Sequence, residues 1–455
     1  MIAPARLAAY DALRAVSTAR ADLPTALSRV RSRLHDERDR ALAGEIATGT
    51  LRWQAAFDLV IASFTGRPAS RLDPEVLDIL RLTAFQLLHL DRIPASAAVN
   101  DAVDLARKAG KQSAAGLVNA VLRRISRERA RLPLPPRPEV PAAAPAAAID
   151  YLTLTLSHPE WLMTRWVDRH GFEAAEAWAR FDNAPAALTL RTNTLKTTRA
   201  RLAEELARHG VTTAPTRFAP HGLAVIEGNP LLTPVAHDGI FSIQDESSQL
   251  VAVLMGARPG ERVLDACASP GGKTTAMAAS MENQGLIVAT DIRGRRVDLL
   301  ARTVHTAGAS CVRVVQADAT RALPFLRRFD CVLLDAPCSG LGTLRRDPDI
   351  RWRRTEADLP RLAASQRDML EQAAEVLAPR GRLLYSTCSS EPDENEAVVT
   401  HFLESRPDFE LFPAVRLPAE LRQFIDSAGH FRTYPFRDQL EAFFAAMLVK
   451  TKDLR

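Results

Sequence analysis

The sequence predicts a multidomain protein with an all-α N-terminal domain, a small α+β middle domain and a C-terminal α/β domain. Three observations lead to this prediction. Apolar residues recur at helical spacing up to residue 131, a proline-rich stretch follows, and from residue 261 short apolar runs alternate with helical patterns. The length of 455 residues agrees with it, because one hydrophobic core rarely covers so long a chain.

The N-terminal domain, residues 1–131, is expected to be a bundle of short helices. Leu77, Leu80 and Leu88 illustrate the helical spacing. Asp73 before Pro74 is a typical helix start, because Asp accepts from free amides and Pro fits the first helical position. Residues 80–110 and 116–127 resemble the RNA-binding domain of the NusB type, a helical bundle. Periodicity indicates only helices, and the resemblance is what implies RNA.

Residues 132–150 contain six prolines and are expected to form an extended, semi-rigid linker. Residues 151–240 are expected to form a small α+β domain that takes part in RNA recognition. A helical pattern with three Trp is followed there by a segment that changes from strand-like to helix-like. Trp161 and Trp166 are expected in the core rather than as base-stacking platforms, because amphipathic helices routinely bury Trp.

The C-terminal domain, residues 241–455, is expected to be doubly wound, with residues 443–450 as its last strand. Strands of a mostly parallel sheet present polar residues at their carboxyl ends, where such sheets bind ligands. Asp335 and Cys338 follow one apolar run, and Cys388 follows another. The pattern therefore predicts that two cysteines face one crevice.

Composition limits the class of protein. The formal net charge is +5, and residues 1–131 contain 21 Lys and Arg against 14 Asp and Glu. Either a polyanionic partner or an ordinary Arg-rich surface explains that excess. Five cysteines without a C-x-x-C pair disfavour a disulfide framework and a zinc site, so no metal is expected. No run of about 18 apolar residues occurs, which favours a cytoplasmic protein without membrane contact.

A glycine-rich loop runs from Cys267 to Lys273, between an expected strand and an expected helix. Paired glycines let the backbone approach a ligand, and the helix N-terminus favours an anionic group. The loop matches neither nucleotide-hydrolysis nor dinucleotide-binding patterns. Asp291 and Asp318 end the next two strands, where a carboxylate can accept from ribose hydroxyls. For Asp318 alone a helix cap is an equally good explanation, but together these carboxylates favour a nucleoside cofactor.

The motifs DACASPGGKT, TDIRGRRVDLL, QADAT, LLDAPCSGLGTLRRDPDIRW and LLYSTCSSEPDENE occur in this order. They resemble those of the RNA cytosine-5 methyltransferases. With its helical N-terminal domain, the chain is similar to the type B enzymes that act on small-subunit ribosomal RNA. The resemblance implies a Rossmann-like class I methyltransferase domain, S-adenosylmethionine as cofactor, and RNA, expected to be 16S ribosomal RNA, as partner of a monomer. Among the implied cofactor-binding residues are Cys267, Ala268, Ser269, Pro270, Gly271, Gly272, Lys273, Asp291, Asp318 and Asp335.

The resemblance also implies catalytic roles. Cys388 is expected to add to carbon 6 of cytosine, because carbon 5 is a poor nucleophile until a thiolate has added to the ring. Asp335 is expected to hydrogen-bond the ring near nitrogen 3, and Cys338 to help release the proton on carbon 5. Lys273 is expected to act electrostatically beside the crevice. Both cysteines lie past their strands, where a thiol can be partly exposed with a lowered pKa.

Some features have ordinary structural explanations. Cys311 and Cys331 are expected to be buried apolar residues, and the thiol of Cys267 to be incidental. The cluster of Arg345, Arg346, Arg351, Arg353 and Arg354 around Trp352 is predicted to grip phosphates or stack a base, or else to be a solvated charge run. The family pattern has Asp-Gly before Phe443, but Glu441 and Ala442 stand there, which puts the local turn in doubt.

Other functions stay open. The same chemistry on transfer RNA or another RNA is a close alternative, and a non-catalytic RNA-binding or assembly module is one from another class. DNA cytosine methylation is a third, but enzymes of that class attack with the cysteine of a Pro-Cys pair, which leaves Cys388 without a role.

Overall fold

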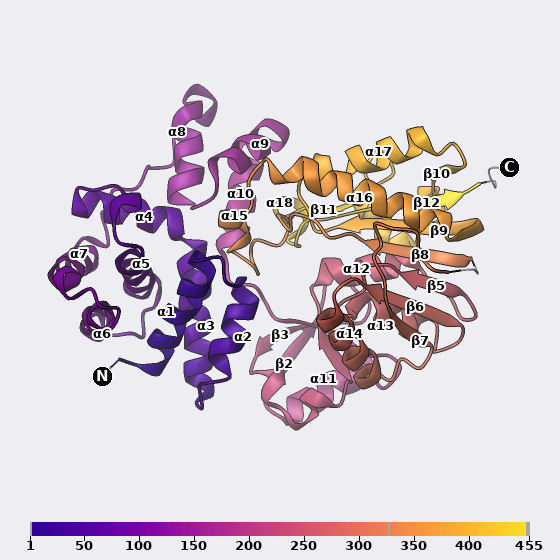
Figure 1. Ribbon diagram of the computed structural model, residues 1–455, viewed down its shortest axis with the longest axis horizontal. Helices are drawn as coiled ribbons and strands as arrows, with labels where there is room; N and C mark the ends of the chain where they lie inside the picture. The colour runs from indigo at the N-terminus through magenta and orange to yellow at the C-terminus, as the bar shows by residue number, and fades with distance from the viewer. Residues whose placement is uncertain (1, 326–327, 452–455) are drawn as a thin grey trace. The chain divides into compact units, whose positions relative to one another are not determined.

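The computed structural model describes residues 2–325 and 328–451 (Figure 1). By packing they divide into two compact units. Unit 1 spans Met1–Pro185 and Leu344–Glu356, and unit 2 spans Ala186–Thr343 and Ala357–Arg455. Across the described part of the chain, every helix is too short or too polar to span a bilayer.

The first part of unit 1 is entirely helical, as predicted. Its main helices are α1 (Pro4–Ser17), α2 (Leu23–Arg31), α3 (Glu37–Arg52), α4 (Gln54–Thr65), α5 (Pro74–His89), α6 (Ala95–Lys108) and α7 (Ala115–Glu128), with short turns η1 (Ala69–Arg71) and η2 (Gln112–Ala114). One apolar core contains Ala9, Ile46, Leu80 and Leu122, which come from α1, α3, α5 and α7. Since each helix contributes one apolar face, the segment forms a bundle.

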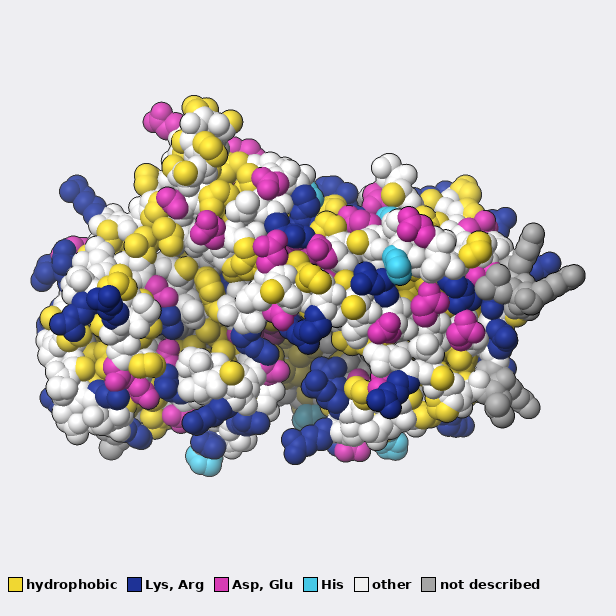
Figure 2. Space-filling view, turned by 45° about the horizontal axis from the view of Figure 1, so that its top comes forward, with side chains coloured by type: hydrophobic (Ala, Val, Ile, Leu, Met, Phe, Trp, Pro, Cys, Tyr) yellow, Lys and Arg dark blue, Asp and Glu magenta, His cyan; other side chains and the backbone are white. Residues whose placement is uncertain are grey.

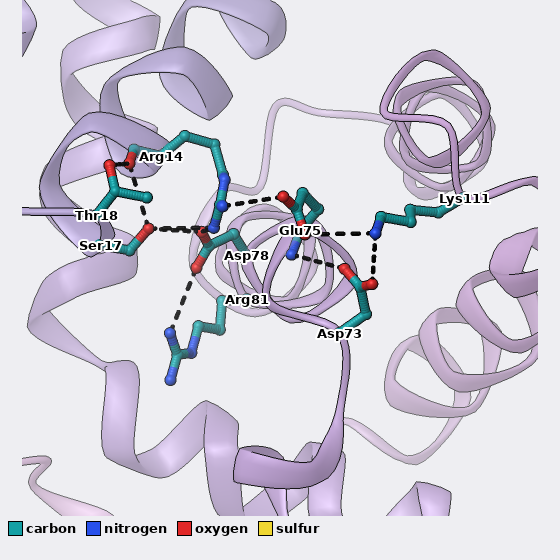
Figure 3. A network of polar contacts seen from close by, with 8 residues as sticks. All are labelled: Arg14, Ser17, Thr18, Asp73, Glu75, Asp78, Arg81 and Lys111. Carbon is teal, nitrogen blue, oxygen red and sulfur yellow. Dashed lines mark hydrogen bonds and ion pairs between the residues drawn. The ribbon is translucent and has the colours of Figure 1, made fainter.

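The start of α5 is fixed as the sequence predicts. Asp73 accepts from the amide of Glu75 at 3.1 Å, and the Lys111 ammonium lies 2.5 Å from the same carboxylate. Figure 3 shows that Arg14 of α1 reaches Glu75 and Asp78 of α5, at 3.1 and 2.7 Å. These partly buried ion pairs connect α1 to α5.

The remainder of unit 1 is also helical. The turn η3 (Pro141–Ala143) precedes α8 (Pro145–Asp150), η4 (Tyr151–Thr155), α9 (Glu160–His170) and α10 (Phe172–Asn183). The extended linker predicted for residues 132–150 is therefore wrong at its end, because a run of Ala after Pro145 favours a helix. Trp166 is buried as predicted and stacks on Trp178, with ring centroids 4.0 Å apart, whereas Trp161 is half-buried.

Residues 344–356, which include α15 (Ile350–Arg353), pack within unit 1 although unit 2 precedes and follows them in sequence. Arg351 is 1% exposed and donates to the carbonyl oxygens of Arg52 and Ser157 at 3.1 and 2.9 Å. Trp352 donates from Nε1 to the Leu51 carbonyl at 2.6 Å. The predicted role in gripping phosphate is therefore wrong for Arg351, because its side chain is buried, whereas Trp352 is half-buried and its stacking on a base stays a prediction.

Unit 2 begins with a small antiparallel sheet in the order β2-β3-β1-β4. Its elements are β1 (Thr189–Thr192), α11 (Arg199–Arg208), β2 (Thr212–Pro215), β3 (Gly222–Glu227), η5 (Pro230–Leu232), η6 (Pro234–His237) and β4 (Phe241–Ile243). Leu202 and Leu206 of α11 pack on Leu190 and Leu223 of the sheet. The change from strand to helix predicted after residue 187 is confirmed.

The second sheet of unit 2 has the order β10-β12-β9-β8-β5-β6-β7, with β11 paired to β12. Its strands are β5 (Arg262–Asp265), β6 (Leu286–Asp291), β7 (Val312–Gln316), β8 (Phe329–Asp335), β9 (Leu377–Thr387), β10 (Phe409–Leu411), β11 (Phe431–Thr433) and β12 (Phe443–Lys450). Neighbours from β9 to β7 are parallel, whereas β12 is antiparallel to β9. This confirms the predicted α/β domain and its last strand.

Helices cover both faces of this sheet (Figure 1). These helices are α12 (Glu246–Met255), α13 (Gly272–Ser280), α14 (Gly294–Ala307), α16 (Asp358–Glu375) and α17 (Glu396–Ser405). The C-terminal part of the chain also contains the short helices η7 (Pro392–Glu394), η8 (Ala414–Arg416), η9 (Ala419–Phe424) and α18 (Pro435–Asp438). One apolar core joins α12, α13 and α14 to Val263 and Leu333, and the other joins α16 and α17 to Leu264 and Leu334. Because alternate strand residues face opposite cores, the sheet is buried on both sides.

Charge is mixed on the surface. In Figure 2, Lys and Arg side chains are spread over the face in view, with Asp and Glu side chains between them.

Candidate active site

The predicted site residues lie at one edge of the large sheet. β5 ends at Asp265, β6 at Asp291 and β8 at Asp335, and Cys388 directly follows β9. These strands are parallel neighbours, so their carboxyl ends meet at the same edge. The topology thus brings together the two cysteine segments and the glycine-rich loop, as the sequence predicts.

The glycine-rich loop connects β5 to α13, which begins at Gly272, within the predicted loop. Gly271 has φ +105°, a conformation that L side chains rarely adopt. A Cβ atom there would also lie 2.9 Å from the Leu300 side chain. This glycine therefore lets the backbone turn closely into the helix, whose first amides lack partners within the helix.

Asp265 belongs to this site, although sequence reasoning assigned it no role. It is 1% exposed, and one carboxylate oxygen accepts from Thr274 at 2.7 Å. Burial, more than any other cause, raises its pKa to about 7, and the nearby Asp335 and Asp291 raise it further. Its Oδ1 has no hydrogen-bond partner among the described residues. A buried acceptor without a partner suits a ligand that donates a hydrogen bond or carries positive charge.

The other two predicted carboxylates differ in their surroundings. Asp291 is 6% exposed and accepts from the amide of Arg293 at 3.1 Å. Asp318 accepts from the hydroxyl and the amide of Thr320, at 2.7 and 3.0 Å, and these bonds lower its pKa. No helix follows Asp318 among the described residues before β8, so the helix-cap explanation is wrong and these contacts belong to a turn. Its role toward a cofactor stays a prediction.

Lys273 and Asp335 form a partly buried ion pair. The ammonium lies 2.6 Å from one oxygen of Asp335, and Ser386 donates to the other at 2.8 Å. The Lys273 nitrogen also lies 5.4 Å from the centre of the Phe443 ring. Burial disfavours the charge of Lys273, but Asp335 and the neighbouring Cys388 outweigh it and raise its pKa. Lys273 therefore places a fixed positive charge beside both groups.

The sulfur atoms of Cys338 and Cys388 lie 3.4 Å apart. The hydrogen bond to Cys388 and burial raise the pKa of Cys338 well above that of an ordinary thiol. The lowered pKa predicted for Cys338 is therefore wrong, because a second negative charge beside Cys388 is unfavourable. At neutral pH Cys338 keeps its proton.

The other three cysteines differ from this pair. Cys311 and Cys331 are buried within apolar cores, as predicted. Burial also raises the pKa of the Cys267 thiol, which suits the expectation that this thiol is incidental.

The turn before Phe443 forms without the glycine of the family pattern. Gln439 adopts a left-handed conformation at φ 59° and ends α18. Ala442 is 2% exposed, and its amide donates to the Gly342 carbonyl at 3.0 Å. Its methyl group therefore fits, and β12 starts in register with β9.

Comparison with known proteins agrees with this arrangement. The family model for 16S rRNA methyltransferase RsmB/F matches residues 252–449, the NusB family model matches residues 3–127, and a ferredoxin-like domain of RsmF/B-like methyltransferases matches residues 158–231. The resemblances inferred from the sequence, to the methyltransferases and to NusB, are thereby confirmed.

Similarity extends over the whole chain. It is 35% identical to a probable ribosomal RNA small subunit methyltransferase B of Bacillus subtilis, with 92% of this chain and 93% of the relative covered. It is 33% identical to the ribosomal RNA small subunit methyltransferase B of Pseudomonas putida, with 98% of each chain covered. The crystal structure of PH0851 has a TM-score of 0.82 at 28% identity, with 99% of each chain covered. The chain therefore belongs to the RsmB/F family of ribosomal RNA methyltransferases.

Proposed function

We propose that this protein transfers a methyl group from S-adenosylmethionine to carbon 5 of a cytosine in 16S ribosomal RNA, through a covalent bond to Cys388. The observation that carries this proposal is the pair of sulfur atoms 3.4 Å apart beside the ion pair of Lys273 and Asp335. One thiol is available to attack the ring and a second to assist release. The membership of the RsmB/F family supports the choice of ribosomal RNA.

The glycine-rich loop is suited to the methyl donor. The sheet edge carries Asp265 with an unpaired buried oxygen, Asp291 and Asp318, and α13 presents its N-terminal amides. Carboxylates fit the ammonium and ribose hydroxyls of S-adenosylmethionine, and helix amides fit its carboxylate. We assign Cys267 through Lys273, Asp291, Asp318 and Asp335 to this pocket. S-adenosylmethionine supplies an electrophilic methyl group on a sulfonium and departs as a neutral thioether.

The first step is addition of the Cys388 thiolate to carbon 6 of cytosine. A sulfur–carbon bond forms, and the electron pair of the ring double bond moves toward carbon 5, which becomes an enamine-like nucleophile. Lys273 favours the thiolate before attack. We assign Asp335, held by Lys273 and Ser386, to accept hydrogen bonds from the amino group of the ring and from nitrogen 3 once that nitrogen has taken a proton from solvent, and this protonated ring favours the addition.

Release requires loss of the proton on carbon 5. The carbon–hydrogen electron pair then restores the ring double bond, and Cys388 leaves as a thiolate. The pKa of Cys338 is raised mainly by its hydrogen bond to Cys388. This effect weakens once the Cys388 sulfur is bonded to carbon. Cys338 then loses its own proton to solvent more readily and accepts the one from carbon 5, directly or through water.

The experiment that tests this assignment compares Cys388→Ala with Cys338→Ala, using S-adenosylmethionine with a radiolabelled methyl group. We expect Cys388→Ala to abolish transfer and Cys338→Ala to accumulate a covalent adduct of protein and RNA on a denaturing gel. Cys311→Ala, at a buried position away from the site, is the control and keeps activity. Full transfer by Cys388→Ala would end the proposed mechanism.

Bisulfite sequencing of RNA from cells with and without the gene tests the substrate. A cytosine protected in 16S ribosomal RNA only when the protein is present supports the proposal. Protection in transfer RNA instead favours the same chemistry on another RNA. No protected cytosine anywhere, with RNA binding intact, favours the non-catalytic module.

A further inference from the structure

Glu394 is the last residue of η7 and is completely buried. Its carboxylate contacts the two segments that carry Cys338 and Cys388. Its Oε1 accepts from the amide of Ser339 at 2.8 Å and from Nε2 of Gln366 at 2.9 Å. Its Oε2 accepts from the hydroxyl of Ser389 at 2.6 Å. All three partners are donors, so this position requires a side chain that accepts hydrogen bonds.

These bonds fall on both sides of the catalytic loops. Ser339 directly follows Cys338 in sequence, and Pro337 directly precedes it. Gln366 also donates to the carbonyl of Pro337, at 3.0 Å. Ser389 follows Cys388. One carboxylate therefore anchors the segment that carries Cys338 to the segment that carries Cys388.

The surroundings hold Glu394 in place. The Tyr385 hydroxyl donates to the Glu394 carbonyl at 2.5 Å, and Asn395 donates to the Ser389 carbonyl at 3.0 Å. Tyr385 and Asn395 are both buried. A buried polar network whose members are all paired is rigid, so movement of the carboxylate is opposed from several directions.

We propose that Glu394 is a positioning residue that keeps the Cys338 sulfur within reach of the ring bonded to Cys388. This inference rests on the proposed function, because it gives the separation of the two thiols a purpose. Glu394 touches no reacting atom. It acts through Ser339 and Ser389, the residues next to the two cysteines.

The electrostatics of Cys338 agree with this placement. The pKa of Cys338 is raised first by its hydrogen bond to Cys388, then by burial and by the charge of Cys388. The charge of Glu394 raises this pKa further. Glu394 therefore also favours the protonated form of Cys338 before the reaction begins.

The first experiment measures the thiol separation without RNA or methyl donor. Dibromobimane alkylates two neighbouring thiols, forming two sulfur–carbon bonds with loss of two bromide ions and two protons. The linked peptides of Cys338 and Cys388 are quantified by mass spectrometry. We expect Glu394→Ala to lower the linking rate at least tenfold, because the Ser339 amide and Ser389 hydroxyl lose their common acceptor.

Glu394→Gln is expected to link at the wild-type rate or faster, because it keeps the hydrogen bonds and removes a negative charge that favours the protonated Cys338 thiol. The amide oxygen accepts from Ser339 and Gln366, its nitrogen donates to Ser389, and Ser389 turns its proton to Ser339, whose hydroxyl lies 3.1 Å away. Glu246→Gln is the matched control, since Glu246 is a buried carboxylate that accepts from the amides of Phe218 and Ala219. If Glu394→Ala fails to fold, Glu394→Asp takes its place, because it retains the charge but is one methylene too short.

The second experiment follows single turnover with labelled methyl donor and RNA. In Glu394→Ala, we expect release of the adduct to slow at least tenfold, with an unchanged KM for the donor, whereas release in Glu394→Gln should not slow. Normal linking and release in Glu394→Ala would overturn the proposal, as would equal losses in Glu394→Gln and Glu394→Ala.

The two proposals fail in different ways. Slow linking in Glu394→Ala, combined with no adduct in Cys338→Ala, leaves the positioning role intact and rejects the proposed chemistry. Normal linking in Glu394→Ala, combined with an adduct in Cys338→Ala, supports the chemistry and rejects the positioning role.

Discussion

The ammonium of Lys273 lies 2.6 Å from a carboxylate oxygen of Asp335. The two residues come from different elements, the first turn of α13 and the end of β8. The pair therefore joins the loop assigned to the methyl donor to the strand that leads to Cys338. Because Cys388 also contributes to the raised pKa of Lys273, this one cation acts on both the carboxylate and the nucleophile.

Lys273→Met is expected to lower kcat by about a hundredfold to a thousandfold, the usual effect of removing one preorganised electrostatic group from an active site. The methionine fills similar volume but leaves Asp335 without its cation and removes the charge that favours the Cys388 thiolate. Single-turnover methyl transfer measures the loss, and slower alkylation of Cys388 by iodoacetamide at neutral pH locates it. Lys196→Met is the control, because Lys196 donates to the carbonyl oxygens of Asp238 and Thr306 and belongs to no predicted site. Equal losses in both variants would contradict the assigned role.

Gly342→Ala is expected to impair catalysis although the added methyl group replaces no catalytic side chain. A Cβ atom at Gly342 would lie 2.1 Å from the carbonyl oxygen of Ala442 and 2.8 Å from that of Cys388. Because both are backbone atoms, the segment that carries Cys388 must shift, and shifts near 1 Å cost about a hundredfold in rate. The measurement is kcat, with donor affinity from calorimetry expected to stay normal. Gly116→Ala, where nothing lies within 4 Å of the added atom, is the control and should have wild-type kcat.

The sheet and its site edge were predictable because their signals are local. Apolar runs such as residues 331–334 and 383–385 indicate buried strands, and polar residues directly after them must lie at the carboxyl edge. That topology and the family resemblance together predicted that Cys338 and Cys388 face the same crevice. The 3.4 Å separation did not, since it depends on the loops beyond the strands.

The features that sequence reasoning missed depend on partners that are distant in the chain. From the sequence, Arg351 is indistinguishable from a surface charge. In the structure, the carbonyl oxygens of Arg52 and Ser157 accept hydrogen bonds from it. Glu394 stands in an acidic run, and its burial depends on donors from two other segments, Ser339 and Gln366. Asp265 sits in a recognised motif, but only the structure reveals its unpaired oxygen. In each case hydrogen bonding, rather than apolar periodicity, decides the position of the side chain.

Arg351→Met is expected to destabilise unit 1 by about 1 to 3 kcal/mol, the usual cost of leaving buried polar groups without partners. Arg351 donates from one nitrogen to Arg52, Ser157 and Asn183, and methionine leaves these acceptors unpaired in the interior. Urea unfolding followed by tryptophan fluorescence reports the change, since Trp166 and Trp178 lie in this unit. Arg107→Met is the control, because Arg107 is exposed and pairs with Asp104 on α6, away from this network. A loss below about 1 kcal/mol for Arg351→Met would show that its charge is not needed in the interior.

Asp265 makes the stability of the ligand-free protein depend on pH. Its pKa is about 7 in the folded protein against 3.8 ordinarily, so the folded state binds the proton more tightly than the unfolded state. Stability from this group is therefore fully present below about pH 4 and is lost as the pH rises through 7, by at most on the order of 4 kcal/mol. Asp265→Asn, which cannot ionise, should lose less stability than wild type between pH 5 and pH 8 in urea unfolding. Asp182 titrates in the same range, with a pKa of about 7, so only the difference between variant and wild type isolates Asp265. Asp330→Asn, at an exposed carboxylate that accepts from the Arg262 amide, serves as the control. Parallel pH profiles for wild type and Asp265→Asn would mean that the carboxylate is already ionised at low pH in the folded protein.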